Sequence, residues 1–506
     1  MSYTIPFDTS YARLPERFYA RTQPTPVTSP RLVKLNVALA GELGLDPSFL
    51  SGDAGLAMLS GNALPGGAAG IATAYAGHQF GGFVPQLGDG RAILIGEIVD
   101  RNGIRRDIQL KGGGPTRFSR GGDGRAAIGP VLREYIISEA MQALGIPTTR
   151  ALAAVTTGQV VLREGALPGA VLTRVASSHI RVGTFQYFAA RGDDEAVRLL
   201  ADHVIARHYP DAADASNPYR ALLDGVVRAQ GELIAQWLLV GFIHGVMNTD
   251  NCSVAGETID YGPCAFLDEY DPRAVFSSID RMGRYAYGNQ PAIGEWNVAR
   301  FAECLLPLIS DDDDQAVTDA TESLTGYADA FERAYRRGLR HKIGLLAEHA
   351  GDVELAQDLL NLMASSAADF TSTFRRLSGV ADTAEAAQAT DAASAEGSAD
   401  AASLRELFAD QAALSAWLSR WHERLQLEPA TPAARAAAMR AVNPAFVPRN
   451  HRVEETIRAA TEHDDFGPFE RLMTVLSRPF EDHPENAAYA TPPSPEERVT
   501  QTFCGT

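Results

Sequence analysis

The chain has 506 residues, of which 45% are hydrophobic and 21% are charged, so it has ample material for a large folded core. Its formal net charge of −18 argues against a general affinity for nucleic acid or for an anionic membrane, because both require basic patches. Four cysteines are too few for a disulfide framework, the longest apolar run is shorter than the ~18–20 residues that span a bilayer, and the N-terminus lacks a signal-peptide pattern. These features predict a soluble cytoplasmic protein.

Residues 1–70 mix turn formers with helical segments, and strands are predicted after them. Residues 1–70 are predicted to form an N-terminal extension with helical segments such as 31–43. Two strands are predicted at 91–97 and 106–111. The Asn102-Gly103 turn between them is typical of a hairpin.

A helix is expected after this hairpin, with Pro130 in its first turn and Gly145 at its end. Two further strands are predicted at 159–162 and 169–174, and the pattern is helical from residue 194 onward. The helical segments expected there are 233–243, 295–306 closed by Pro307, 328–346, 355–363 and a last one that begins at 404.

A β-rich portion followed by a larger helical portion predicts an α+β fold with two lobes and a small-molecule site between them. The tract 380–403 has almost no large apolar residue, so it is predicted to be a flexible insertion. The expected organisation is an N-terminal extension (1–70), a β-rich lobe (71–170), a helical lobe (171–379), the insertion (380–403) and a C-terminal helical segment with a tail (404–506).

The segment 244–251, His-Gly-Val-Met-Asn-Thr-Asp-Asn, places several polar side chains directly after an apolar run. Asp260-Tyr-Gly262 follows nine residues later. Carboxylate and amide oxygens at this density suit a hard cation such as Mg²⁺, and Asn251 and Asp260 are the predicted ligands. The alternative is a polar turn that closes the preceding helix, because Asn and Asp bond their own backbone readily.

Several residues of the β-rich portion could bind phosphate. Gly88-Asp-Gly90 precedes a strand and would let backbone N–H groups approach an anion, although a plain tight turn has the same pattern. Lys111 ends the next strand and could neutralise phosphate, unless it is simply a solvated strand end. Glu134 on the following helix could hold Lys111 by an ion pair, as in protein kinases.

Two glycine-rich runs, 112–114 and 121–124, match neither a dinucleotide nor a Walker fingerprint. They could still bind a nucleotide through backbone contacts, with Asp123 and Arg125 supplying polar side-chain contacts. Arg174 and Arg181 could bind a terminal phosphate through paired N–H bonds. Surface salt bridges are the alternative for these two arginines.

The polar segment matches part of the protein-kinase catalytic loop, His-Arg-Asp-x-x-x-x-Asn. His244 and Asn251 are separated by seven positions, as in that motif, and Asp260 stands where Asp-Phe-Gly supplies the second metal ligand. The position of the kinase base is occupied by Val246, which is typical of a pseudokinase. Asp250 is the only nearby carboxylate that could accept a hydroxyl proton instead.

Four segments carry a resemblance to a known family. They read Tyr75-Ala-Gly-His-Gln-Phe-Gly-Gly82, Gln86-Leu-Gly-Asp-Gly-Arg91, Gln109-Leu-Lys-Gly-Gly-Gly-Pro-Thr116, and Gly245-Val-Met-Asn-Thr-Asp-Asn251 with Asp260-Tyr-Gly-Pro263. Together they resemble the selenoprotein O family, in order, from about residue 70 to about residue 300. The resemblance implies a kinase-like fold that transfers AMP, rather than phosphate, from ATP to protein hydroxyls. The ATP is then reversed relative to kinases, so that its α-phosphate meets the acceptor.

The resemblance also implies a role for each matching residue. The nucleotide is expected to contact Gly88, Gly90, Arg91, Lys111 paired with Glu134, Asp123, Gly124, Arg174, Arg181 and Asp260. Asn251 and Asp260 are expected to hold Mg²⁺, or alternatively Mn²⁺, and Asp250 to accept the proton. The expected partners are ATP and client proteins with Ser, Thr or Tyr acceptors, with no nucleic acid and no membrane.

Two other functions stay open at this point. One is kinase-type transfer of the γ-phosphate, although the missing carboxylate at Val246 speaks against it. The other is an inactive nucleotide-binding scaffold with a redox role. The family is named for a selenocysteine near the C-terminus, where this chain has Cys504, and a disulfide to Cys264 is one hypothesis. Two unrelated thiols are the alternative in a reducing cytosol, and Cys252 and Cys304 are assigned to packing.

Overall fold

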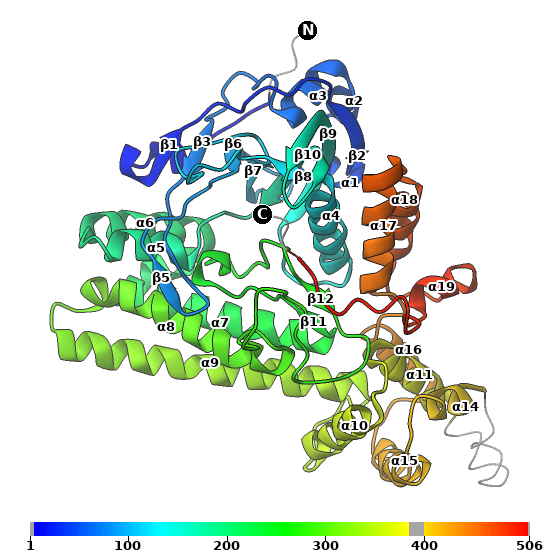
Figure 1. The fold of residues 1–506 in the computed structure, drawn as a ribbon. Helices are drawn as coiled ribbons and strands as arrows, with labels where there is room; N and C mark the ends of the chain where they lie inside the picture. The colour runs from blue at the N-terminus through cyan, green and yellow to red at the C-terminus, as the bar shows by residue number, and fades with distance from the viewer. Residues whose placement is uncertain (1–4, 384–398, 504–506) are drawn as a thin grey trace.

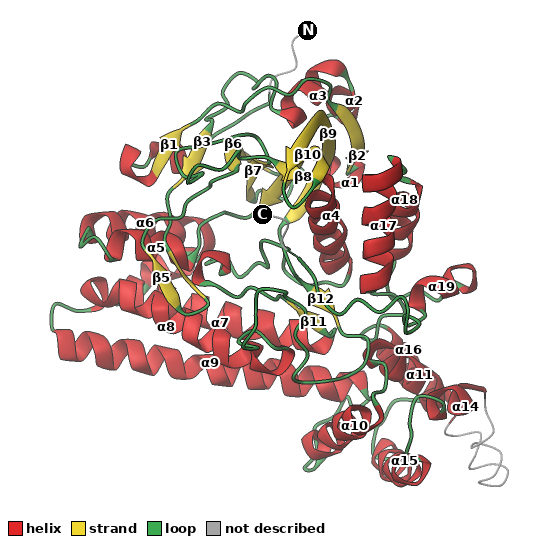
Figure 2. Cartoon of the chain, viewed as in Figure 1, coloured by secondary structure: helices red, strands yellow, loops and turns green. Residues whose placement is uncertain are grey.

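The computed structural model describes residues 5–383 and 399–503, with an antiparallel sheet at one end and a group of long helices at the other (Figures 1 and 2). The sheet has eight strands. In spatial order they are β1 (Tyr19–Arg21), β3 (Ile71–Thr73), β6 (Ala92–Val99), β7 (Arg105–Lys111), β10 (Ala166–Ala176), β9 (Arg150–Leu162) and β2 (Arg31–Leu35), with β8 (Ala126–Ala127) paired to β10. The mixed α and β composition and the predicted hairpin between β6 and β7 are confirmed.

Both faces of the sheet are covered, which explains why β6 is apolar along nearly its whole length. Helices α1 (Val37–Glu42), α2 (Pro47–Ser51) and α3 (Asp53–Ser60) pack their apolar residues against one face. Helix α4 (Ile128–Ala143) covers the other face with residues such as Leu132 and Ile136. Residues 1–70 thus supply two strands and three helices to the body that contains the sheet.

The helical prediction for 31–43 was wrong in its first half. Residues Arg31–Leu35 form β2, which pairs antiparallel with β9, and only Val37–Glu42 are helical. Asn36 separates the two elements, because its side chain accepts a hydrogen bond from the Leu39 backbone and caps α1. Pairing with a sheet edge outweighs helix propensity here.

The helical part begins after the sheet. Its helices are α5 (Val182–Ala189), α6 (Asp194–His208), α7 (Pro218–Leu239), α8 (Gln290–Ile309), α9 (Asp313–Lys342), α10 (Asp352–Ser366), α11 (Phe370–Thr383), α14 (Ala399–Arg405), α15 (Gln411–Leu425), α16 (Pro432–Arg440), α17 (Asn450–His463), α18 (Gly467–Leu476) and α19 (Ala487–Ala490). Four short strands lie outside the main sheet: β4 (Gly77–Gln79) pairs with β5 (Gly82–Val84), and β11 (Phe242–Ile243) with β12 (Ala265–Phe266).

Three predicted helix boundaries are corrected. Helix α7 ends at Leu239 rather than at residue 243, because Gly241 adopts a left-handed conformation (φ +74°) and the chain continues as β11. Pro307 does not close α8, which continues to Ile309; in the last turn a proline costs only one helical hydrogen bond. Helix α9 begins at Asp313, earlier than expected, since Asp312 caps it.

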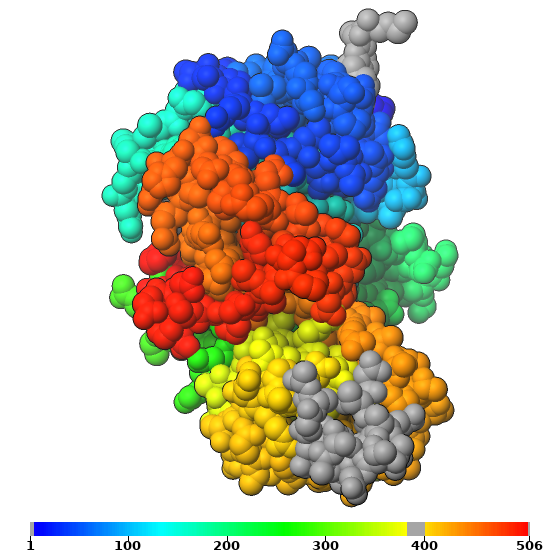
Figure 3. All heavy atoms as spheres, turned by 90° about the vertical axis from the view of Figure 1, so that its right-hand side faces the viewer, coloured from blue at the N-terminus to red at the C-terminus, as the bar shows by residue number. Residues whose placement is uncertain are grey.

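The C-terminal part of the chain returns to the sheet end. Helices α17 and α18 pack against α4, where the rings of Tyr135 and Phe469 lie 5.4 Å apart. Figure 1 shows the two helices beside α4, and Figure 3 shows this orange segment against the blue N-terminal residues. Of the expected insertion, residues 384–398 lie outside the described residues, as does Cys504; the flanking parts belong to α11 and α14.

Two further expectations concern membranes and cysteines. Within the described ranges, 5–383 and 399–503, every helix is too short or too polar to cross a membrane. Cys252 and Cys304 are buried in the apolar core, in agreement with their assignment to packing.

A buried arginine ties the C-terminal helices to the rest of the helical part. Arg449, which precedes α17, binds both carboxylate oxygens of Asp369 at 2.7 and 2.8 Å and one oxygen of Asp268 at 3.1 Å. We expect Arg449→Met to lower the free energy of unfolding by roughly 3–5 kcal/mol, because the buried carboxylate of Asp369 and the part-buried one of Asp268 lose their cation. Denaturant titration measures this loss, and Arg458→Met at an exposed position of α17 is the matched control. Equal stabilities of the two variants would contradict the prediction.

Candidate functional site

A cavity of about 770 Å³ lies between the sheet and the helical part. Its wall is formed by the ends of β6, β7 and β10, the start of α4, and the loops 115–125, 246–251 and 260–263. All the site residues expected from the sequence line this one cavity: Gly88, Gly90, Arg91, Lys111, Asp123, Gly124, Glu134, Arg174, Arg181, Asp250, Asn251 and Asp260. The fold therefore brings together residues that are up to 172 positions apart (260 − 88 = 172).

The carboxylate of Asp260 is surrounded by three cations. Its Oδ1 lies 2.9 Å from Lys111 Nζ and 2.6 Å from Arg174 Nη1, and its Oδ2 lies 3.0 Å from Arg181 Nη1. Glu134 is the second anion of the group, since it pairs with Lys111 and, at 3.1 Å, with Arg174. Burial alone would raise the pKa of Asp260, but the three cations hold that pKa well below its usual value. Among all the residues that line the cavity, seven cations (Lys111 and six arginines) stand against five carboxylates, which leaves a formal surplus of two positive charges (7 − 5 = 2).

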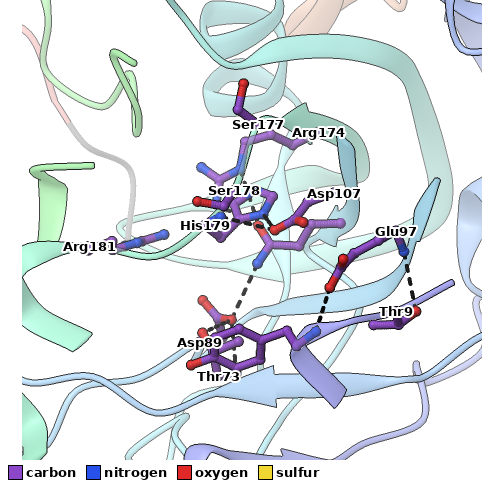
Figure 4. A network of polar contacts seen from close by, with 12 residues as sticks. Thr9, Thr73, Asp89, Glu97, Asp107, Arg174, Ser177, Ser178, His179 and Arg181 are labelled. Carbon is purple, nitrogen blue, oxygen red and sulfur yellow. Dashed lines mark hydrogen bonds and ion pairs between the residues drawn. The ribbon is translucent and has the colours of Figure 1, made fainter. Parts of the chain in front are cut away.

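The sheet sets the positions of two of these cations. In the register of β7 and β10, Lys111 stands opposite Leu172 and Gln109 opposite Arg174, so Lys111 and Arg174 share a face. Gln109 accepts two hydrogen bonds from the Arg174 guanidinium, at 2.6 and 3.2 Å. Gln109 also donates from its Nε2 to Asp89 Oδ2 at 3.3 Å, which links Arg174 to Asp89. Figure 4 shows Arg174 and Asp89 within this region of polar contacts.

The alternative of surface salt bridging for the two arginines is therefore wrong. Arg174 is 1% exposed and Arg181 is 3% exposed, and their ion pairs are internal. Removing such a pair from water is costly, so two buried arginines beside the part-buried Lys111 call for a strong compensating anion. Asp260 supplies part of that compensation, and the remaining positive charge lies next to the cavity.

Asp260 has an unusual backbone for a residue with a side chain. Its φ is +64°, in the left-handed region, which costs free energy that the surrounding contacts must offset. His244 contributes to this local order, because its Nε2 lies 2.9 Å from the carbonyl oxygen of the neighbouring Ile259. The imidazole is 1% exposed and burial lowers its pKa, so it is neutral near pH 7 and acts as a support of the loop.

The polar segment forms a turn and also lines the cavity. Thr249–Asn251 form a short 3-10 helix, but this turn does not close the preceding helix as the alternative held, because α7 ends at Leu239 and β11 lies between them. Asp250 is 7% exposed; its Oδ2 accepts a hydrogen bond from Gln79 Nε2 at 3.1 Å, while its Oδ1 has no partner within the described residues. Burial raises the pKa of Asp250 to about 6, although Gln79 and Arg181 oppose the shift. A carboxylate of this kind can take up a proton near neutral pH.

A divalent cation would find two oxygen ligands on the cavity wall. The Nδ2 of Asn251 donates to the Val246 carbonyl at 3.0 Å, its amide oxygen has no hydrogen-bond donor among the described residues, and Asp260 is anionic. In the described part of the chain, no group of three His, Cys, Asp or Glu side chains could hold a metal ion. Two protein ligands fit Mg²⁺, which is commonly bound by one or two side chains together with substrate phosphates and waters.

The glycines of the cavity wall allow close backbone approaches. Gly88 has φ +85°, and a Cβ there would lie 2.4 Å from the Phe118 ring. Gly124 has φ +65°, and a Cβ there would lie 2.1 Å from the backbone of Gly114. Only glycine satisfies both requirements, so the two glycine-rich runs pack against each other at one side of the cavity.

The charged residues near these loops differ in their availability. Arg163 pairs with both oxygens of Asp123, at 2.9 and 3.0 Å, and Arg125 donates to carbonyl oxygens of residues 25 and 26. Asp123 and Arg125 thus have structural partners, whatever else they contact. Arg91 and Arg120 line the cavity and, within residues 5–383 and 399–503, have no ion-pair or hydrogen-bond partner for their guanidinium groups. Both are available to an anionic ligand.

Sequence reasoning missed Gln79, Arg120 and Arg163. Gln79 lies in the motif Tyr75–Gly82, so a signal was present, but nothing in the motif indicated its contact with Asp250. Arg163 and Asp123 are 40 positions apart on different elements, and no local pattern links them.

Comparison with known proteins shows to which family the chain belongs. The model of the family described as "Protein adenylyltransferase SelO" matches residues 2–477 of the chain. The chain belongs to this family. It is 64% identical to a protein nucleotidyltransferase YdiU of Bradyrhizobium sp. strain BTAi1, 63% to that of Methylorubrum populi and 62% to that of Rhodopseudomonas palustris strain BisB18, in each case over 506 residues and the whole of both chains. The resemblance found in the sequence is confirmed.

The tight packing of the glycine-rich runs yields a paired test. Gly121 and Gly124 both have positive φ, but a Cβ at Gly121 would meet nothing within 4 Å. Gly121→Ala is expected to lose about 1 kcal/mol of stability from the backbone alone. Gly124→Ala must also displace the backbone of Gly114, so its free energy of unfolding should fall by about 1–3 kcal/mol more than that of Gly121→Ala. Denaturant titration measures both variants, and equal stabilities would contradict the prediction.

Proposed function

We propose that this protein is a protein adenylyltransferase, which transfers AMP from ATP to Ser, Thr or Tyr hydroxyls of client proteins. Membership of the family and the nucleotidyltransferase relatives support the reaction class. The observation that carries the proposal is the ion-paired group of Lys111, Arg174 and Arg181 around Asp260, which faces the same cavity as the buried carboxyl of Asp250.

We further propose that the fold is related to that of protein kinases, with the sheet as the small lobe and the helices as the large lobe. Two features support this relationship. The pairing of Lys111 on β7 with Glu134 on α4 corresponds to the ion pair of a strand lysine with a helix glutamate in kinases. The loop that contains Asn251 and the Asp260 segment meet at the cavity, as the metal-binding elements of kinases do.

The nucleotide phosphates are proposed to bind at the surplus of positive charge. Lys111, Arg174 and Arg181 are already desolvated and held in place by the protein, so they can stabilise phosphate charge without further reorganisation. Arg91 and Arg120 can add charge-assisted hydrogen bonds at the wall of the cavity. Preorganised cations of this kind contribute most where charge develops in the transition state.

The proposed metal ion is Mg²⁺, or Mn²⁺, which accepts the same oxygen ligands. Asn251 would hold it through its free amide oxygen and Asp260 through its carboxylate. A bound divalent ion supplies charge neutralisation on the phosphate oxygens. For Asp260 to bind this cation, Lys111 or Arg174 would have to give up part of its pairing with Asp260 and pair with phosphate oxygens instead.

The group transfer requires a proton acceptor beside the reacting hydroxyl. In the proposed step the acceptor oxygen forms a bond to the α-phosphorus, the bond from that phosphorus to the bridging oxygen breaks, and pyrophosphate leaves. The hydroxyl proton goes to the carboxylate of Asp250. Val246 occupies the place of the usual kinase base and offers no acceptor atom, so the missing group speaks against γ-phosphate transfer. Other nucleotides, such as UTP, and the cytoplasmic location stay predictions.

The reaction class is tested by mass. We expect the purified protein, incubated with ATP and Mg²⁺, to add ~329 Da to itself or to lysate proteins, whereas a kinase would add ~80 Da. Asp260→Ala should abolish the addition, because it removes a metal ligand and the anion that orders three cations. An addition of ~80 Da, or none with the wild-type protein, would refute the proposal. If the Asp260→Ala variant kept the wild-type effect in cells although it transfers no AMP, an inactive scaffold would be favoured instead.

The role of Asp250 predicts a pH dependence. A carboxyl accepts a proton only when it is ionised, and burial raises the pKa of Asp250 to about 6. The rate of adenylation at saturating ATP and Mg²⁺ should therefore rise through pH ~6 to a plateau, and fall below that value. Asp250→Asn should reduce the rate ~100-fold or more and remove this limb of the profile. A wild-type rate that is constant between pH ~5 and ~7 would contradict the assignment.

A further inference from the structure

The hairpin of β4 and β5 crosses from the sheet end to the helical part. Figure 1 shows β5, in blue, among the green helices α5 and α8. The hairpin turns at Phe80 and Gly81, which both have positive φ (+52° and +86°). It contacts three consecutive residues of the polar segment, 248–250.

Each of these three residues meets a different part of the hairpin. The backbone N–H of Phe80 donates to Asn248 Oδ1 at 3.1 Å, and that of His78 donates to Thr249 Oγ1 at 2.7 Å. Both contacts use the hairpin backbone, so they do not depend on the side chain of Gln79. They fix the hairpin against the loop in one register.

The carboxyl group of Asp250 is enclosed by the same strand. Gln79 Nε2 donates to its Oδ2 at 3.1 Å. Gly77 lies against its other side: a Cβ at Gly77 would be 2.4 Å from Asp250 Oδ1 and 2.9 Å from the Asp250 Cβ. Helix α5 also lies close to this residue, since a Cβ at Gly183 would approach the Asp250 Cα to 3.2 Å. The carboxyl group thus has one hydrogen-bond donor from a side chain of the hairpin and little free space.

We propose that Gln79 is a positioning residue, which holds the Asp250 carboxyl in the orientation that meets the acceptor hydroxyl. Gln79 and Asp250 both line the cavity, so the amide acts at its edge. This inference rests on the proposed function, and it adds a component of the site that lies 171 positions before Asp250. A carboxyl misplaced by about 1 Å can lower a rate ~100-fold.

The test separates positioning from structural support. In Gln79→Met the side chain keeps its length and loses the donor, while the backbone contacts of the hairpin remain. We expect kcat for AMP transfer to fall roughly 10- to 100-fold, with KM for ATP and the affinity for ATP changed less than about twofold. Gln142→Met, at an exposed position of α4, is the matched control and should leave kcat, KM and the thermal midpoint unchanged.

A double-mutant cycle with Asp250→Asn shows whether Gln79 acts through Asp250. If it does, adding Gln79→Met to Asp250→Asn costs little further activity, measured as labelled AMP incorporated. An equal loss in both backgrounds, an unchanged kcat in Gln79→Met, or a loss of ATP affinity as large as the loss of kcat would each overturn the inference. Wild-type protein without AMP transfer would instead refute the proposed function, so the two failures are distinguishable.

Discussion

The pairing of Asp260 with Lys111, Arg174 and Arg181 is the interaction on which the rest of the site depends. The four side chains come from two strands, from the N-cap of α5 and from a loop with a left-handed residue. Arg174 and Arg181 could not stay buried without an anion, since an unpaired buried charge costs several kcal/mol. The ion pairs therefore hold the sheet end and the helical part in one arrangement, and the cavity between them is a consequence of that arrangement.

The carboxylates of the cavity wall do not neutralise all of its positive charge, and this bears on the proposed function. Five carboxylates stand against seven cations on the cavity wall, and two of these cations, Arg91 and Arg120, have no partners of their own in the described chain. A protein with a net charge of −18 thus keeps a local site for an anion. A surplus of positive charge at one cavity supports the proposal that an anionic ligand such as a nucleotide triphosphate binds there. Binding of the phosphates would complete the neutralisation that folding leaves unfinished.

Much of the site could be predicted, because its residues fall into short motifs with known chemistry. The pairing of Lys111 with Glu134 followed from a strand lysine and a helix glutamate in order, and the structure contains it. The hairpin, α4 and the strands β9 and β10 were found near their expected places, although with different limits. Predictions failed where tertiary contacts decide the outcome, as in β2, whose helical propensity yields to pairing with β9, and at Gly241, where a single left-handed residue ends α7.

The sequence by itself determined the family, the mixed α and β composition and the set of polar residues that could meet at one site, since these depend on residue type and short spacing. Only the tertiary structure decided which atoms meet. Arg174 and Arg181, which the sequence allowed either at the surface or at a phosphate, are buried partners of Asp260. Gln79 contacts Asp250, which lies 171 positions later in the chain. Contacts of this kind depend on strand register and on the packing of distant elements, which no local pattern of residues encodes.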